Sequence, residues 1–128
     1  AERIYEKHRT GTFYEIDADG NKVTRIVGNS YEIVAGTEYV NVKGDVNLTV
    51  DSNCNTYIKG NWNIQVDGDK TEVVTGKVSE TYKDTKTENV TGAVSETYQS
   101  NQTTNITGTL DLDASSEVDI DAGVINLN

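Results

Sequence analysis

Glycine recurs at every eighth position through most of this chain, and that spacing restricts the possible folds more than any other feature. Nine of the 11 glycines fall in one register of eight, and the residues that interrupt the series are small or turn-forming. Glycine reaches backbone angles that other residues avoid, so a glycine at a fixed place marks a bend. The sequence therefore predicts structural corners at Gly28, Gly36, Gly44, Gly60, Gly68, Gly76, Gly92 and Gly108.

The eight-residue units, called octads below, favour β-structure. Helical repeats run to seven or eleven residues, whereas eight is a multiple of the strand period of two. Thr, Val, Tyr and Ile, which fill the octads, prefer strands. Each octad is therefore expected to hold a strand of about six residues and a corner. The apolar or aromatic side chains two positions before each corner share one face and form the predicted core: Ile26, Val34, Val42, Val50, Ile58, Val66, Val74, Tyr82, Val90, Tyr98 and Ile106.

Charged residues share this inward face by the same parity. Lys70 and Lys86 fall on it, together with several glutamates. An isolated buried charge costs several kcal/mol, roughly. We therefore expect the two lysines to pair with neighbouring glutamates and the interior to hold water, becoming drier toward the C-terminal end.

A single octad cannot fold alone. Fixing its backbone costs about 8–16 kcal/mol, and each buried aliphatic side chain returns about 1.5–3 kcal/mol. Stacking is therefore obligatory. Either one chain coils and pairs strands 24 residues apart, or three chains wind together and each octad stacks on a neighbouring chain. The sequence has no 24-residue correlation stronger than its 8- and 16-residue periods. This favours an all-β, triple-stranded intertwined β-helix, which is an octapeptide-repeat solenoid forming a homotrimeric prism.

Composition and motifs argue against several classes of function. The net charge of −10 disfavours nucleic acid as a partner. Acidic residues recur with the repeat, so no unique pair of carboxylates suggests catalysis. We therefore expect that this chain is not an enzyme, contains no catalytic residue and binds no metal or cofactor. Cys54 and His8 each occur once and lie far apart in the sequence. Residues 17–21, Asp-Ala-Asp-Gly-Asn, resemble a calcium loop with the wrong spacing, so a hairpin turn is expected there.

The Val-x-Gly octads end in an apolar segment at residues 119–128, and residues 8–21 form a distinct lead-in. Together these features resemble the C-terminal needle of the central baseplate spike of contractile, T4-like phages. Valine-glycine spikes of type VI secretion are similar. The resemblance implies a homotrimeric needle, located in the virion at the tail baseplate, that helps to cross the bacterial outer membrane mechanically. It also implies upstream spike domains, among them a lysozyme domain, and a small protein capping the tip.

The resemblance and the repeat together divide the chain into three parts. Residues 1–27 are the lead-in with a hairpin, residues 28–109 the octad β-helix, and residues 110–128 its apolar tip. The expected contacts of the tip-capping protein are Val124, Ile125 and Leu127. Some relatives carry a metal-binding histidine pair near the tip, which this sequence lacks. Two alternatives remain: the spike tip of a type VI secretion system, or the stalk of a trimeric carbohydrate-binding tailspike with outward tyrosines.

Overall fold

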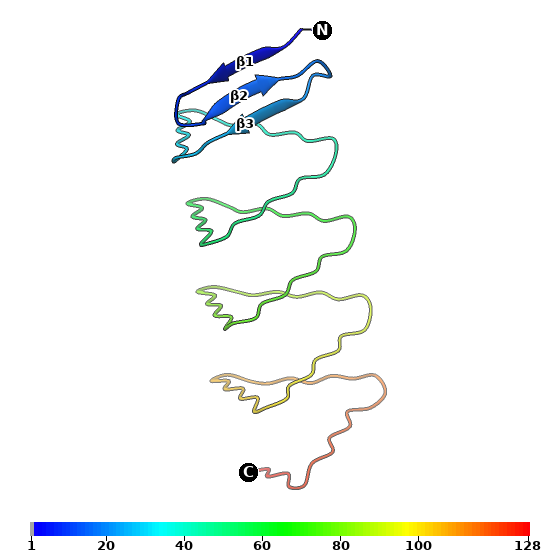
Figure 1. Cartoon of the computed structure of the whole chain (residues 1–128). Coiled ribbons are helices and arrows are strands. Elements are labelled where there is room, and N and C mark those ends of the chain that lie inside the picture. Colours follow the sequence, from blue (N-terminus) through cyan, green and yellow to red (C-terminus); the bar gives the residue numbers. More distant parts are fainter. Residues whose placement is uncertain (1) are drawn as a thin grey trace. The chain divides into compact units, whose positions relative to one another are not determined.

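The computed structural model describes residues 2–128, and all regular secondary structure in that range is β. Three strands, β1 (Ile4–Lys7), β2 (Phe13–Ile16) and β3 (Lys22–Arg25), form an antiparallel sheet in the order β1-β2-β3 (Figure 1). No helix occurs among the described residues, so the all-β prediction is confirmed. The chain divides into two compact units, one ending at Gln65 and one running from Val66 to Asn128. The sheet belongs to the first.

The turn between β2 and β3 lies where the sequence placed a hairpin. Asp17 organises it: its carboxylate accepts hydrogen bonds from the backbone N–H of Asp19 at 3.0 Å and of Asn21 at 2.9 Å. The Asn21 side-chain amide donates a third at 3.0 Å. Gly20 follows with φ of 81°, a backbone conformation that favours glycine. These three hydrogen bonds to Asp17 define the hairpin turn expected at this place.

Strand β1 was not anticipated from the sequence. It pairs with β2 in a register that sets Tyr5 opposite Glu15 and Lys7 opposite Phe13. The rings of Tyr5 and Phe13 lie 5.9 Å apart, and Arg3 Nε lies 2.6 Å from Glu15 Oε1. These side-chain contacts, added to the backbone ladder, hold a strand of only four residues in place.

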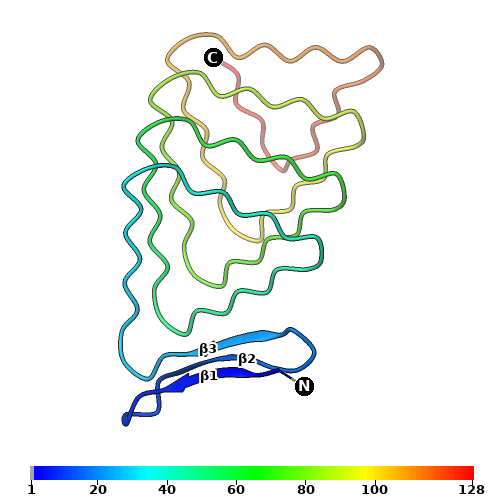
Figure 2. The same cartoon turned by 90° about the horizontal axis from the view of Figure 1, so that it is seen from above.

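The octads that follow the sheet have a regular path but no ladder. The chain bends at every register position from Gly28 to Ser116, including the positions held by serine or aspartate. Between bends it runs in short straight segments, and within each unit the turns have a triangular outline (Figure 2). Segments 24 residues apart do not pair, because no strand is formed anywhere in residues 28–128. The octads of one chain are therefore extended and bent at the expected spacing, without a paired neighbouring strand.

No described residue is buried. Residues 11–17, around β2, are half-buried, and every residue from 18 to 128 is exposed. The regularly bent octads of each unit therefore enclose no core of their own. The boundary between octad and tip segments near residue 110 stays a prediction.

The Asp17 turn should loosen only in acid. The hydrogen bond from the Asn21 side chain is the main cause that holds the pKa of Asp17 below its ordinary value of 3.8. A lowered carboxyl pKa gives stability that is present above the ordinary value and lost as the pH falls through the lowered one. Replacing Asn21 with alanine should therefore raise the pKa of Asp17, as measured by NMR titration of its carboxyl carbon. An unchanged midpoint in Asn21→Ala would contradict this description of the turn.

Candidate functional site: the inward face of the octads

The even-numbered residues from Ile26 to Ala122 make up what we call the inward face, and the odd-numbered residues the outward face. The predicted core residues, all on the inward face, are 42–60% exposed. Val27 on the outward face is 53% exposed, but five other apolar residues there are far more open, at 82–93%: Tyr31, Ile33, Tyr39, Tyr57 and Val73. Side chains two positions before each corner are therefore the more sheltered set, although one chain does not bury them.

The corners do not depend on left-handed backbone. Among the described residues only Gly11 and Gly20 have a positive φ, and both lie in the lead-in. The physical reason given for the octad glycines on sequence grounds is therefore wrong. A Cβ added to Gly28, Gly76 or any other octad glycine would also meet nothing within 4 Å in the single chain. Neither backbone strain nor crowding inside one chain explains why glycine recurs there.

Two ion pairs lie on the inward face at equivalent places. Lys70 Nζ is 3.3 Å from Glu72, and Lys86 Nζ is 3.2 Å from Glu88, sixteen residues further along. The expectation that the inward lysines pair with neighbouring glutamates is met. Lys86 also lies over the ring of Tyr82, 5.2 Å from its centroid. The hydrogen bond and charge of Glu88 raise the pKa of Lys86 above its ordinary 10.5, with smaller contributions from Tyr82 and Glu80. The lysine therefore stays charged at any physiological pH.

The remaining predicted site residues are separate from this face or at its end. Val124, Ile125 and Leu127, the expected tip contacts, are all exposed. Cys54 is exposed and carries a free thiol. His8 lies in the lead-in, where its Nδ1 is 2.9 Å from the hydroxyl of Thr10. A shallow hollow of about 240 Å³ next to it is lined by Glu6, His8, Thr12, Phe13, Tyr14 and Thr24.

Chemistry-bearing residues do not converge in the described part of the chain. Within residues 2–128, no three His, Cys, Asp or Glu side chains gather in a way that could hold a metal ion. The same residues form no helix of the length and apolarity needed to span a membrane. The feature that repeats, and that the sequence organises most strongly, is the inward face itself: apolar positions beside alternating charges, open along each unit.

Comparison with known proteins gives one class of relative. The chain is similar to a phage protein over part of its length: Protein Gp5 of Vibrio phage KVP40 is 47% identical over 57 residues. The match covers 44% of this chain and only 14% of that phage protein. No family model matches the sequence. The resemblance to phage proteins thus has direct support, from less than half of the chain.

Proposed function

We propose that three copies of this chain wind round one axis as a triple-stranded β-helix. This rod is the needle of a phage tail baseplate spike and helps to penetrate the bacterial outer membrane. The observation that carries the proposal is the open inward face: a regularly bent chain with an ordered apolar stripe and no strand partner of its own. The similarity to the phage protein Gp5 supports placing this rod in a virion.

The solvent-accessible surface of the single chain is far larger than that of a folded monomer. It amounts to 14379 Å². A compact folded protein of the same 14.0 kDa mass exposes about 6,700 Å², and the unfolded chain about 20,000 Å². Hydrophobic burial supplies most of the free energy of folding, so this path requires partners that cover the inward face. Further copies of the chain are the natural partners, because they carry the same stripe at the same spacing.

Interleaving also satisfies the backbone. Consecutive turns of the coil in the second unit stand apart and form no ladder (Figure 1). If two other chains supply the strands between these turns, each octad gains a neighbour on both edges, at the usual spacing of about 4.8 Å. Each layer then consists of three copies of one octad. The recurrent glycine gains a reason as well, since a corner without a Cβ leaves room for a neighbouring chain to pass closely.

Such a rod suits mechanical work. A chain wound with two copies of itself cannot unfold locally without breaking ladders to both partners, which makes unfolding slow. The outward face is polar over most of its length, and the net charge of −10 per chain disfavours sticking to anionic lipid. Upstream spike domains, a lysozyme domain among them, belong to this proposal because of the family resemblance, as does the baseplate location. No catalytic role is proposed for the present residues.

A second candidate is a carbohydrate-binding stalk. Tyr31, Tyr39 and Tyr57 are 82–90% exposed on the outward face, as sugar-stacking aromatic residues require. Binding of the assembled protein to a glycan array, abolished by changing these tyrosines to alanine, would favour this alternative over the needle.

The proposed assembly of three chains predicts the molecular mass of the protein in solution. Three chains of 14.0 kDa give 42 kDa, and sedimentation equilibrium of the purified protein should return that value at micromolar concentration. A protein that sediments as a single chain would contradict the proposal.

Corner glycines should matter for assembly. Gly76→Ala adds a methyl group where nothing lies within 4 Å in one chain, so a cost can arise only between chains. Crowding of this kind typically destabilises by about 1–3 kcal/mol. Thermal unfolding of the trimer should therefore occur at a lower temperature than in the wild type. Ser100→Ala is the matched control, because a side chain already occupies that corner and should be dispensable. Equal melting temperatures for Gly76→Ala and the wild type would count against close passage at the corner.

The tip should bind a separate protein. Val124 and Leu127 are 75% and 91% exposed, at the end of the apolar segment. A last layer of this kind leaves strand edges and apolar side chains uncovered, which favours a cap. A pull-down of the phage's small tail proteins should succeed with the full chain and fail after removal of residues 118–128. Undiminished capture by the shortened chain would remove the tip from the proposal.

A further inference from the structure

We infer that the inward face between Lys70 and Tyr98 is a self-recognition surface, which accepts further copies of this chain in one register only. The inference rests on the three-chain assembly proposed above. A repeat of eight carries a risk, because chains displaced by a whole octad still align corner with corner and strand with strand. Something other than the glycines must therefore select the correct register.

The inward residues of this stretch follow a two-layer code. One kind of octad, here called a lysine layer, presents lysine, glutamate and valine; the other, a tyrosine layer, presents valine, glutamate and tyrosine. The two kinds alternate. The lysine layers hold Lys70, Glu72 and Val74, then Lys86, Glu88 and Val90, and the tyrosine layers hold Val78, Glu80 and Tyr82, then Val94, Glu96 and Tyr98. The inward face therefore repeats after sixteen residues, whereas the backbone repeats after eight.

The structure shows contacts that belong to this code. Each lysine layer has its own ion pair, Lys70 with Glu72 and Lys86 with Glu88. Lys86 also reaches back to the Tyr82 ring, so a lysine layer interacts with the tyrosine layer before it. All these residues lie in the unit from Val66 to Asn128. The lysine is thus held by a carboxylate on one side and by an aromatic ring on the other.

A displacement of one octad breaks the code. In the correct register, a tyrosine layer separates any two lysines on one face of the prism, so they lie about 10 Å apart at two layer spacings. If one chain moves by eight residues, lysines of two chains come into adjacent layers, about 5 Å apart, where like charges repel. The tyrosines of adjacent layers meet in the same way. Repulsion between the lysines is therefore what rejects this error.

A displacement of two octads keeps lysine and tyrosine layers alternating, but it places a charged residue in the apolar tip segment. Such a shift brings Glu96 of the displaced chain level with Leu112 of its partners, next to Leu110, because these inward positions are sixteen residues apart. A carboxylate among leucines has no cationic partner there and is costly to bury. The apolar tip segment thus removes the one displacement that the lysine and tyrosine layers tolerate.

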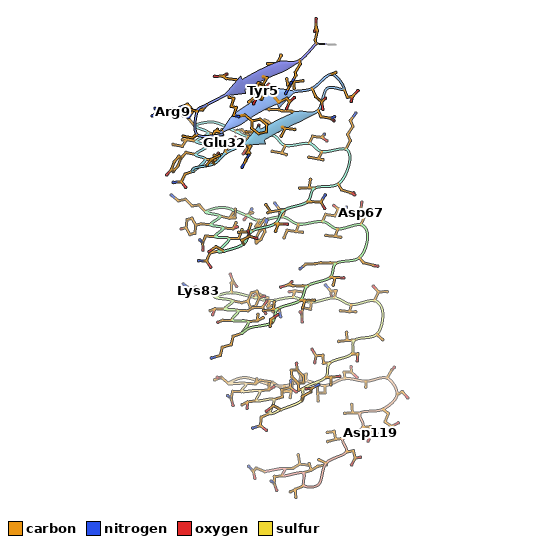
Figure 3. All side chains as sticks on the ribbon, in the orientation of Figure 1. Tyr5, Arg9, Glu32, Asp67, Lys83 and Asp119 are labelled. Carbon is orange, nitrogen blue, oxygen red and sulfur yellow. The ribbon has the colours of Figure 1, made fainter. Side chains whose placement is uncertain are left out.

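The matching partner is another copy of this chain, since a partner must carry the same alternation at the same spacing. Lysines on the outward face do not belong to the alternating layers that select the register. Lys83, labelled in Figure 3, is odd-numbered and so belongs to the outward face, whereas Lys86 is even-numbered and belongs to the inward face. Lys83 therefore provides a control position that differs from Lys86 in the face it occupies.

The test moves one lysine by one octad without changing the composition. In V78K/K86V the lysines occupy adjacent layers even in the correct register, so that register loses its advantage. In the control, K83T/T91K, a lysine moves by the same distance on the outward face. A threefold-symmetric trimer gives one NMR signal for each valine methyl group. The wild type and the control should show single signals, and V78K/K86V should show each of them split into several.

A second variant covers the case in which V78K/K86V does not assemble. K70Q/K86Q removes both charges, and Gln102 already occupies the equivalent position in the next octad of this kind, so the side chain is accommodated. Its methyl signals should also split. Single signals from the assembled K70Q/K86Q trimer, or split signals from the wild type, would overturn the inference. A wild-type protein that is a single chain would instead overturn the proposed trimer, so the two failures are distinguishable.

Discussion

Unpaired strand edges are the constraint on which this structure depends. Every residue in an extended segment has an N–H and a C=O that need partners, and those partners must come from a neighbouring strand. Here the octads bend at regular intervals, and residues 28–128 form no ladder within the chain. The regular corners, the open inward face and the large exposed area are consequences of one arrangement. In the arrangement that we propose, other copies of the chain supply the neighbouring strands.

The types of residue on the inward and outward faces change from the N-terminal to the C-terminal end of the octads. The inward face has apolar positions throughout, charged layers in the middle, and Leu110, Leu112, Val118 and Ile120 at the end. The outward face has aromatic and aliphatic side chains in the first octads, asparagine and threonine in the middle, and acidic residues between 111 and 121. No lysine or arginine follows Lys86. If three chains assemble as proposed, the C-terminal end has an apolar interior and an acidic exterior, which suits a needle that must not adhere to anionic surfaces.

Much of this could be predicted from the sequence because the repeat is strictly local. Bends at the register positions and the pairing of Lys70 and Lys86 with glutamates follow from spacing alone, whereas the inward core stays a prediction. Strand β1 was missed, because four residues without clear alternation give no signal, and its stability comes from contacts such as Tyr5 with Phe13. The role of the glycines was also misjudged. Their φ angles are not positive, and the proposal that glycine leaves space for a neighbouring chain concerns contacts that one sequence does not display.

Interchain contacts offer the most direct test of the central claim. An assembly made from isotope-labelled and unlabelled chains allows NOEs between different chains to be separated from those within one chain. If three chains interleave, the methyl groups of Val66 should show NOEs to Val74 of another chain, since octads one step apart are then adjacent layers. If one chain coils on itself, Val66 should instead show NOEs to residues 24 positions away in the same chain, and the proposed three-stranded needle would be wrong.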